Sequence, residues 1–208
     1  MKTLVVVSHM DDESFGLGGT LIRLCQEDPT QVKVLSICNG RDIENKIERQ
    51  TSFMNNMNKL GCSCSVLGYD DLSLPDKPLH VLSDQIKEEI DKFEPERVIT
   101  NSISDIHQDH VITSKATRIA CRPYKSNVKV LQEFKIPCSS GDDTFNIAVD
   151  ITGVINEKIE MCCLYQTELC DDGYKPNSLI GIRNVNRGDG ILYGIGYIEL
   201  LRDVWRIC

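Results

Sequence analysis

The 208-residue sequence has no long apolar run and no excess of positive charge. Apolar runs such as Leu4–Val7 fall far short of the roughly 20 residues that span a bilayer and of the roughly 7–15 in a signal-peptide core. We therefore expect a cytoplasmic protein without a transmembrane segment. Its 23 basic and 31 acidic side chains give a formal charge of -8. Because phosphate contacts supply much of the affinity for nucleic acids, this balance argues against such a partner.

Cysteine, in contrast, is plentiful, with ten residues in the chain. Disulfide scaffolds are mainly short secreted chains, whereas these cysteines lie mostly in apolar stretches such as Met161–Leu164. We therefore predict that most are reduced thiols in the core. The close pair Cys62 and Cys64 has a spacing that a metal or redox site can use, but no second pair at ligand spacing accompanies it.

Apolar, β-branched stretches alternate with stretches of helical spacing along the whole chain. With 41% hydrophobic residues to form a core, this predicts one α/β domain over residues 1–208, a Rossmann-like three-layer sandwich with a mainly parallel sheet. The predicted strands are Lys2–Ser8, Val32–Cys38, Ser63–Leu67, Arg97–Thr100, Val128–Phe134 and Phe145–Ile151. Besides a helix after the first strand, the predicted helices are Ile47–Leu60, Leu79–Phe93, His110–Arg122, Val154–Tyr165 and Tyr197–Ile207. The Gly-rich stretch Asp171–Gly190 predicts a loop.

An acidic segment follows the first predicted strand, with His9 and then Asp11, Asp12 and Glu13. Neighbouring carboxylates repel one another unless a cation or the N-terminus of a helix offsets their charge. An acidic helix cap and a metal site both account for this segment taken alone.

A second polar segment, Asp105–His110, follows a later strand and contains His107, Asp109 and His110. The chain has four histidines, and three of them fall in these two segments, which the predicted topology places on one edge of the sheet. Histidines that converge with carboxylates suit a catalytic zinc site of two histidines and one carboxylate, with an open position for water. The remaining groups are suited to act as a base and to face an oxyanion.

The pattern His-x-Asp-Asp-Glu after an N-terminal strand, with His-x-Asp-His after a later one, resembles the PIG-L/LmbE-type zinc-dependent de-N-acetylases. The best-known members of this family deacetylate N-acetylglucosamine conjugates. Weaker matches extend over most of the chain, at Gly18-Gly19, Cys38-Asn39-Gly40, Leu60-Gly61, Lys158, Tyr165-Gln166, Arg187-Gly188 and Gly196-Tyr197-Ile198-Glu199.

The resemblance implies one zinc ion per chain, held by His9, Asp12 and His110. It makes Asp11 the general base, gives His107 the role of stabilising or protonating the tetrahedral intermediate, and makes Asp109 the residue that orients the His107 ring. Candidate substrate contacts are Arg41, Arg49 and Tyr165, although surface arginines are often only solvated and Tyr165 is equally suited to ending a helix. The implied partner is a small acetamido sugar, and a homo-oligomer is compatible with the sequence.

Three positions depart from the family pattern. Met10 and Gln108 stand where the family has proline, which leaves the chemistry intact, and Ser52 stands where it often has glutamate, which puts the substrate contacts around Arg49 in doubt. A dinucleotide-binding fingerprint fails because Leu21 stands where its third glycine belongs. A non-catalytic metal- or sugar-binding protein of the same fold and an amidase for a non-sugar amide remain as alternatives.

Overall fold

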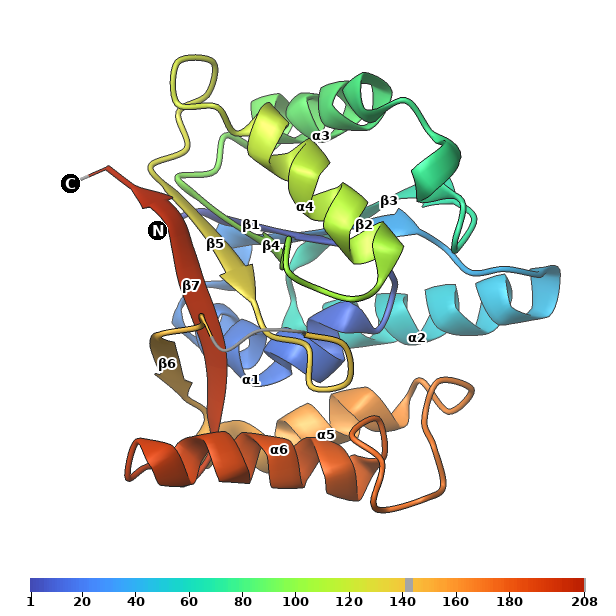
Figure 1. The fold of residues 1–208 in the computed structure, drawn as a ribbon, viewed down its shortest axis with the longest axis vertical. Helices are drawn as coiled ribbons and strands as arrows, with labels where there is room; N and C mark the ends of the chain where they lie inside the picture. Colours follow the sequence, from blue (N-terminus) through green and yellow to red (C-terminus); the bar gives the residue numbers. More distant parts are fainter. Residues whose placement is uncertain (141–143, 208) are drawn as a thin grey trace.

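A mixed β-sheet forms the middle layer of the computed structural model, which describes residues 1–140 and 144–207 (Figure 1). Within these residues the sheet has seven strands in the order β3-β2-β1-β4-β5-β7-β6. The first five run parallel to one another, and β7 pairs antiparallel with both β5 and β6. The strands are β1 (Thr3–Val7), β2 (Val32–Cys38), β3 (Ser63–Tyr69), β4 (Arg97–Asn101), β5 (Val130–Phe134), β6 (Ile147–Asp150) and β7 (Ile198–Arg206).

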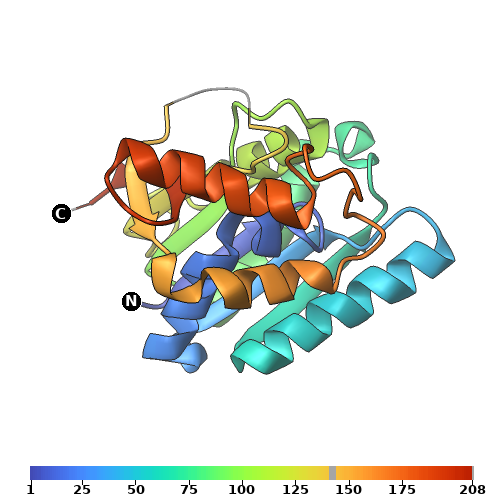
Figure 2. The same ribbon diagram turned by 90° about the horizontal axis from the view of Figure 1, so that it is seen from below.

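Helices cover both faces of the sheet. The face above the sheet in Figure 1 carries α3 (Leu79–Phe93) and α4 (Gln108–Ala120), and the opposite face carries α1 (Asp12–Glu27) and α2 (Ile43–Leu60). Beyond these, α5 (Ile155–Cys163) packs on α1, and α6 (Leu179–Leu192) packs on α5 (Figure 2). Short 3-10 turns occur at η1 (Pro29–Gln31), η2 (Leu74–Asp76) and η3 (Thr152–Val154).

The burial of both faces explains the unbroken apolar sequence of β1. Side chains alternate along a strand, so Leu4 and Val6 join the core under α3 and α4, whereas Val5 and Val7 join the core under α1. All four side chains are fully buried. The predicted α/β class with a mainly parallel sheet is therefore confirmed, and no helix in the described part of the chain is long and apolar enough to cross a membrane.

Two predictions for the C-terminal part were wrong. The stretch Tyr197–Ile207 is not a helix but contains β7, because the slot between β5 and β6 buries Ile198 and Leu200 and pairs the backbone on both sides. The predicted loop Asp171–Gly190 contains most of α6. Ser178 caps the N-terminus of this helix, since its hydroxyl oxygen accepts a hydrogen bond from the backbone N–H of Gly181. Its glycines permit close packing, since a Cβ at Gly190 would lie 2.8 Å from the carbonyl oxygen of Ile195.

The cysteines in the described residues are all free thiols. Five of them are buried: Cys25, Cys38, Cys62, Cys121 and Cys162. Cys138 is exposed, and Cys208 lies outside the described residues.

A buried ion pair connects α5 to the sheet. The ammonium group of Lys158 on α5 lies 2.7 Å from Glu199 on β7, and both side chains have 0% exposure. Glu199 also accepts hydrogen bonds from the backbone N–H groups of Gly19 and Thr20 on α1, at 2.9 and 2.7 Å. Several weak family matches therefore lie in one structural cluster that fixes α1, which begins at the candidate site.

We expect Lys158→Met to lower the free energy of unfolding by about 3–5 kcal/mol, because it leaves the Glu199 carboxylate buried without a counter-charge. Urea titrations of the variant and the parent protein measure this loss. Lys59→Met is the matched control, since it removes the partner of Glu160 from a pair in which both side chains are more than half exposed. Equal stabilities for the two variants would show that the buried pair has no special role.

Candidate active site

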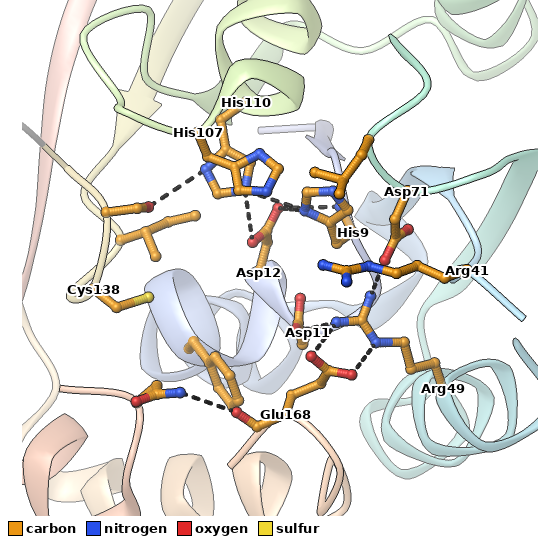
Figure 3. A pocket seen from close by; sticks show the side chains of 15 residues that line it. His9, Asp11, Asp12, Arg41, Arg49, Asp71, His107, His110, Cys138 and Glu168 are labelled. Carbon is orange, nitrogen blue, oxygen red and sulfur yellow. Dashed lines mark hydrogen bonds and ion pairs between the residues drawn. The ribbon is translucent and has the colours of Figure 1, made fainter. Parts of the chain in front are cut away.

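The site lies where the carboxyl ends of neighbouring parallel strands meet. His9, Asp11 and Asp12 follow β1 and lead into α1, and His107 and His110 lie at the N-terminus of α4, which follows β4. Because β1 and β4 are paired neighbours, residues about 100 positions apart come together. They line a cavity of about 190 Å³, shown in Figure 3.

Three predicted ligands surround a common point. His9 Nδ1 lies 3.2 Å from His110 Nε2 and 3.7 Å from Asp12 Oδ2, and His110 Nε2 lies 3.4 Å from Asp12 Oδ1. Two atoms that each lie about 2.0–2.1 Å from a tetrahedral ion are roughly 3.3–3.4 Å apart. The three side chains, which point towards one another in Figure 3, therefore suit one small divalent ion.

Buried partners hold these side chains in the required orientation. His9 Nε2 lies 3.0 Å from Asp109 Oδ2, and His110 Nδ1 lies 3.1 Å from Asp105 Oδ2. Each ring thus has one nitrogen on a carboxylate and the other facing the common point, the usual arrangement of histidines that bind metals. Asp12 Oδ2 accepts from the His9 backbone N–H and from the Asn101 side-chain amide, at 3.1 and 3.0 Å.

The electrostatics of this cluster also favour a cation. Burial opposes protonation of His9, yet its hydrogen bonds to Asp109 and Asp12 raise its pKa to about 10. Burial likewise opposes protonation of His110, yet Asp12 and Asp105 raise its pKa to about 9. A divalent ion supplies the positive charge that two protons otherwise bring, so the donor set fits a metal.

Asp11 lies beside these ligands and is 8% exposed. Burial raises its pKa to about 6, although the nearby Arg49 guanidinium acts in the opposite direction. Arg49 Nη2 lies 3.0 Å from Asp11 Oδ2 and fixes the carboxylate at the cavity wall. A carboxylate held in this way is suited to accept and return a proton near neutral pH.

The His107 ring stacks on His110, with ring centroids 4.5 Å apart. Its Nδ1 accepts a hydrogen bond from the backbone N–H of Asp109 at 3.3 Å, which places the ring proton on Nε2. Burial, reinforced by the positive charge of His110 and His9, keeps the pKa of His107 below its ordinary value. His107 is therefore a neutral hydrogen-bond donor that lines the cavity.

The expected partner of Asp109 needs correction. The hydrogen bonds of its carboxylate go to other partners than the His107 ring: it contacts His9 Nε2 and accepts a 2.7 Å hydrogen bond from the backbone N–H of Leu72. Asp109 thus orients a candidate metal ligand through its carboxylate, and it hydrogen-bonds the His107 ring through its backbone N–H.

The expected substrate residues fall into three different environments. Arg49 lines the cavity, but its guanidinium already pairs with Asp11, Asp71 and Glu168. Arg41 also lines the cavity, and within residues 1–140 and 144–207 its guanidinium has no carboxylate partner.

Tyr165 does not face the cavity, contrary to expectation. It is 1% exposed, and its hydroxyl donates a 2.6 Å hydrogen bond to Glu13 Oε1. Its ring makes an edge-to-face contact with Phe15, and Phe15 lines the cavity. Tyr165 is therefore one layer of side chains away from the cavity.

Sequence reasoning did not assign roles to several residues of the site. Asp105 lies in the second motif, and Asp71 follows the end of β3, so both had a positional signal. Glu168 had none, because it comes from the loop after α5 and reaches Arg49 only in the folded chain. Ser52, where the family often has glutamate, instead donates to the carbonyl oxygen of Leu164.

Comparisons with known proteins show which family the sequence matches. A protein-family model described as PIG-L: GlcNAc-PI de-N-acetylase matches residues 4–121. The Escherichia coli K12 protein described as uncharacterized deacetylase YaiS is 32% identical over 125 residues, which cover 57% of this chain and 67% of that protein.

Solved structures share the whole fold. N,N'-diacetylchitobiose deacetylase from Pyrococcus horikoshii aligns with a TM-score of 0.79 at 18% identity, covering 98% of this chain and 84% of that chain. GalB, the 4-carboxy-2-hydroxymuconate hydratase from Pseudomonas putida KT2440, aligns with a TM-score of 0.79 at 18% identity, covering 100% and 98%. Because one fold hosts different reactions, these two likenesses establish the architecture alone.

We expect His110→Ala to abolish tight zinc binding, because it removes one of three ligand atoms. Asp105→Asn keeps all three atoms but weakens the orientation of His110, so we expect zinc affinity to fall about 10–100-fold. Calorimetric titration of metal-free protein with zinc measures both effects. His80→Ala, at the exposed fourth histidine, is the control and should bind as the parent does. Unchanged affinity in His110→Ala would contradict the ligand assignment.

Proposed function

Because the chain belongs to the PIG-L (GlcNAc-PI de-N-acetylase) family, we propose that it is a zinc-dependent enzyme that removes the acetyl group from an N-acetylhexosamine conjugate. The observation that carries the proposal is the convergence of His9, His110 and Asp12 on one point, with Asp11 beside it. The relative in Pyrococcus horikoshii, described as an N,N'-diacetylchitobiose deacetylase, makes an acetamido sugar the first substrate class to test.

A zinc ion held by His9, Asp12 and His110 would polarise the acetyl carbonyl and lower the pKa of water. Asp11 takes a proton from the attacking water, since it is a buried carboxylate on the cavity wall that Arg49 holds in place. His107 directs its Nε2 proton at the carbonyl oxygen as that oxygen becomes negative. Asp11 then returns its proton to the leaving amine, which leaves the site ready for another cycle.

The polar wall of the cavity suits a sugar ring. Asp71 and Glu168 offer carboxylate oxygens that accept hydrogen bonds from hydroxyl groups, and Arg49 holds both carboxylates in place. Arg41, with its unpaired guanidinium in the described structure, is the group that we assign to a hydroxyl or anionic oxygen of the substrate.

Asp11→Asn is expected to keep bound zinc but to lower kcat by roughly 10²–10⁴, because the amide has nearly the same shape but cannot accept the proton. Acetate release is followed for zinc-loaded protein on free, lipid-linked, nucleotide-linked and thiol-conjugated N-acetylhexosamines. Metal analysis of each preparation excludes loss of zinc as the cause. Full activity in Asp11→Asn would rule out Asp11 as the base, and silence of the zinc-loaded parent across the panel would count against the sugar substrate.

A further inference from the structure

A second group of candidate metal ligands lies beside the His9 ring. His9, Cys38 and Asp71 each offer one ligand atom, and these atoms lie within 4.8 Å of one another. The three residues lie at the carboxyl ends of β1, β2 and β3, which are neighbouring parallel strands. The catalytic group, in contrast, joins the end of β1 to the residues that follow β4. His9 therefore belongs to both groups.

Strand pairing fixes the second group. The backbone N–H of Cys38 donates to the carbonyl oxygen of Ser8 at 2.8 Å, which puts Cys38 next to His9. Cys38 is also the register partner of Tyr69, two residues before Asp71. Asp71 Oδ1 accepts from a backbone N–H of the loop after β2 at 3.1 Å. The loops after β2 and β3 are thus tied to each other beside the end of β1.

The two groups use opposite nitrogens of the His9 ring. Nδ1 lies 3.2 Å from His110 Nε2, on the side of the catalytic ligands. Nε2 lies 3.0 Å from Asp109 Oδ2, and the same oxygen accepts from the backbone N–H of Leu72, the residue after Asp71. Figure 3 shows the His9 ring between His110 and Asp71. Nε2 is therefore the nitrogen that faces the second group.

The surroundings of the Cys38 thiol are negatively charged. Burial raises the pKa of this thiol, and the carboxylates of Asp109 and Asp71 raise it further, although Arg49 acts in the opposite direction. Asp109 is 0% exposed, and its Oδ1 has no hydrogen-bond partner within residues 1–140 and 144–207. Asp71 Oδ2 pairs with Arg49 at 2.9 Å, but a carboxylate oxygen has a second lone pair. A cation at this place offsets negative charge that is costly to bury.

The second group differs from the catalytic group in its sulfur atom. A thiolate ligand favours soft metal ions, which we call thiophilic cations. Atoms bound to one tetrahedral ion lie roughly 3.3–3.6 Å apart, so side-chain movements of roughly 1 Å close the second group around an ion. His9 and Asp71 line the cavity, which gives a cation its route to the buried sulfur. Asp109, at Nε2 already, supplies a further oxygen.

We propose that His9 Nε2, Cys38 Sγ and Asp71 form a second metal position, which takes a thiophilic cation and competes with the catalytic ion for His9. As the cation bonds to Sγ and Nε2, the Cys38 thiol proton is released to water and the His9 proton moves from Nε2 to Nδ1. A neutral imidazole has one nitrogen lone pair free for a metal. With its proton on Nδ1, His9 is no longer a ligand of the catalytic group. A thiophilic cation at the second position thus disables the first.

Titration of metal-free protein with cadmium chloride, under a thiol-free reductant, tests the position. A cadmium–thiolate bond gives a charge-transfer absorbance in the ultraviolet, which imidazole and carboxylate ligands do not give. We expect this band to saturate at one cadmium per chain in the parent and in His110→Ala, which loses a ligand of the catalytic group alone. Cys38→Ser and Cys38→Ala should lose the band. Cys138→Ser, which removes a thiol that lines the cavity, should keep it.

Zinc binding provides the control for folding. Cys38→Ser and Cys38→Ala should bind one zinc with the parental affinity in calorimetry, since Cys38 is not a ligand of the catalytic group. Cadmium added to zinc-loaded parent should displace the zinc, measured by metal analysis after desalting. In the Cys38 variants the cadmium concentration for half displacement should rise by at least about tenfold, because loss of even an outer partner of a ligand weakens metal binding about 10–100-fold.

The outcomes decide on the position and on the competition. An undiminished band in the Cys38 variants, or no band in the parent, would overturn the second position. A cadmium–thiolate band in a parent that keeps all of its zinc would overturn the competition for His9. These readouts measure cation binding and need no acetate release, so they are independent of the proposed deacetylase function.

Discussion

The contact between the Asp109 carboxylate and the His9 ring is the constraint on which the site depends. It connects α4 to the end of β1, fixes which nitrogen of His9 faces His110, and through its second partner Leu72 sets the path of the loop after β3. Asp109 is fully buried, and its other oxygen has no hydrogen-bond partner within residues 1–140 and 144–207. A carboxylate in that position costs free energy unless positive charge lies close to it. His9 is the place for the positive charge that compensates Asp109, because its Nε2 lies 3.0 Å from the Asp109 carboxylate.

The molecule contains two groups of buried charges, one in the scaffold and one at the cavity. Lys158 and Glu199 form a closed pair without solvent contact, and they hold α1 and α5 against β7. Arg49 forms a network that faces the cavity, since its guanidinium pairs with Asp11, Asp71 and Glu168. The closed pair stabilises the scaffold, whereas the open network faces the substrate and holds the base. Removal of the Lys158 charge is therefore expected to lower stability, whereas removal of the Arg49 charge is expected to impair the chemistry.

The sheet topology by itself leaves the reaction open, because a deacetylase and a hydratase share this architecture with the chain. The chemistry of the site depends on its donor set, in which two histidines and an aspartate converge beside a second carboxylate.

The pattern of residues was enough to predict the parallel α/β scaffold and the meeting of His9, Asp12, His107 and His110, because loops after neighbouring parallel strands must emerge at one edge. The same pattern did not predict β7, because its apolar spacing also matches a helix. This segment is a strand because its backbone pairs with β5 on one side and with β6 on the other. Nor did the pattern determine the partners of Asp109 and Tyr165, or the arrival of Glu168 at Arg49. These contacts depend on side-chain direction and on loop paths between distant segments. These partners are set by tertiary packing, because residues that are close in the sequence do not favour one distant partner over another.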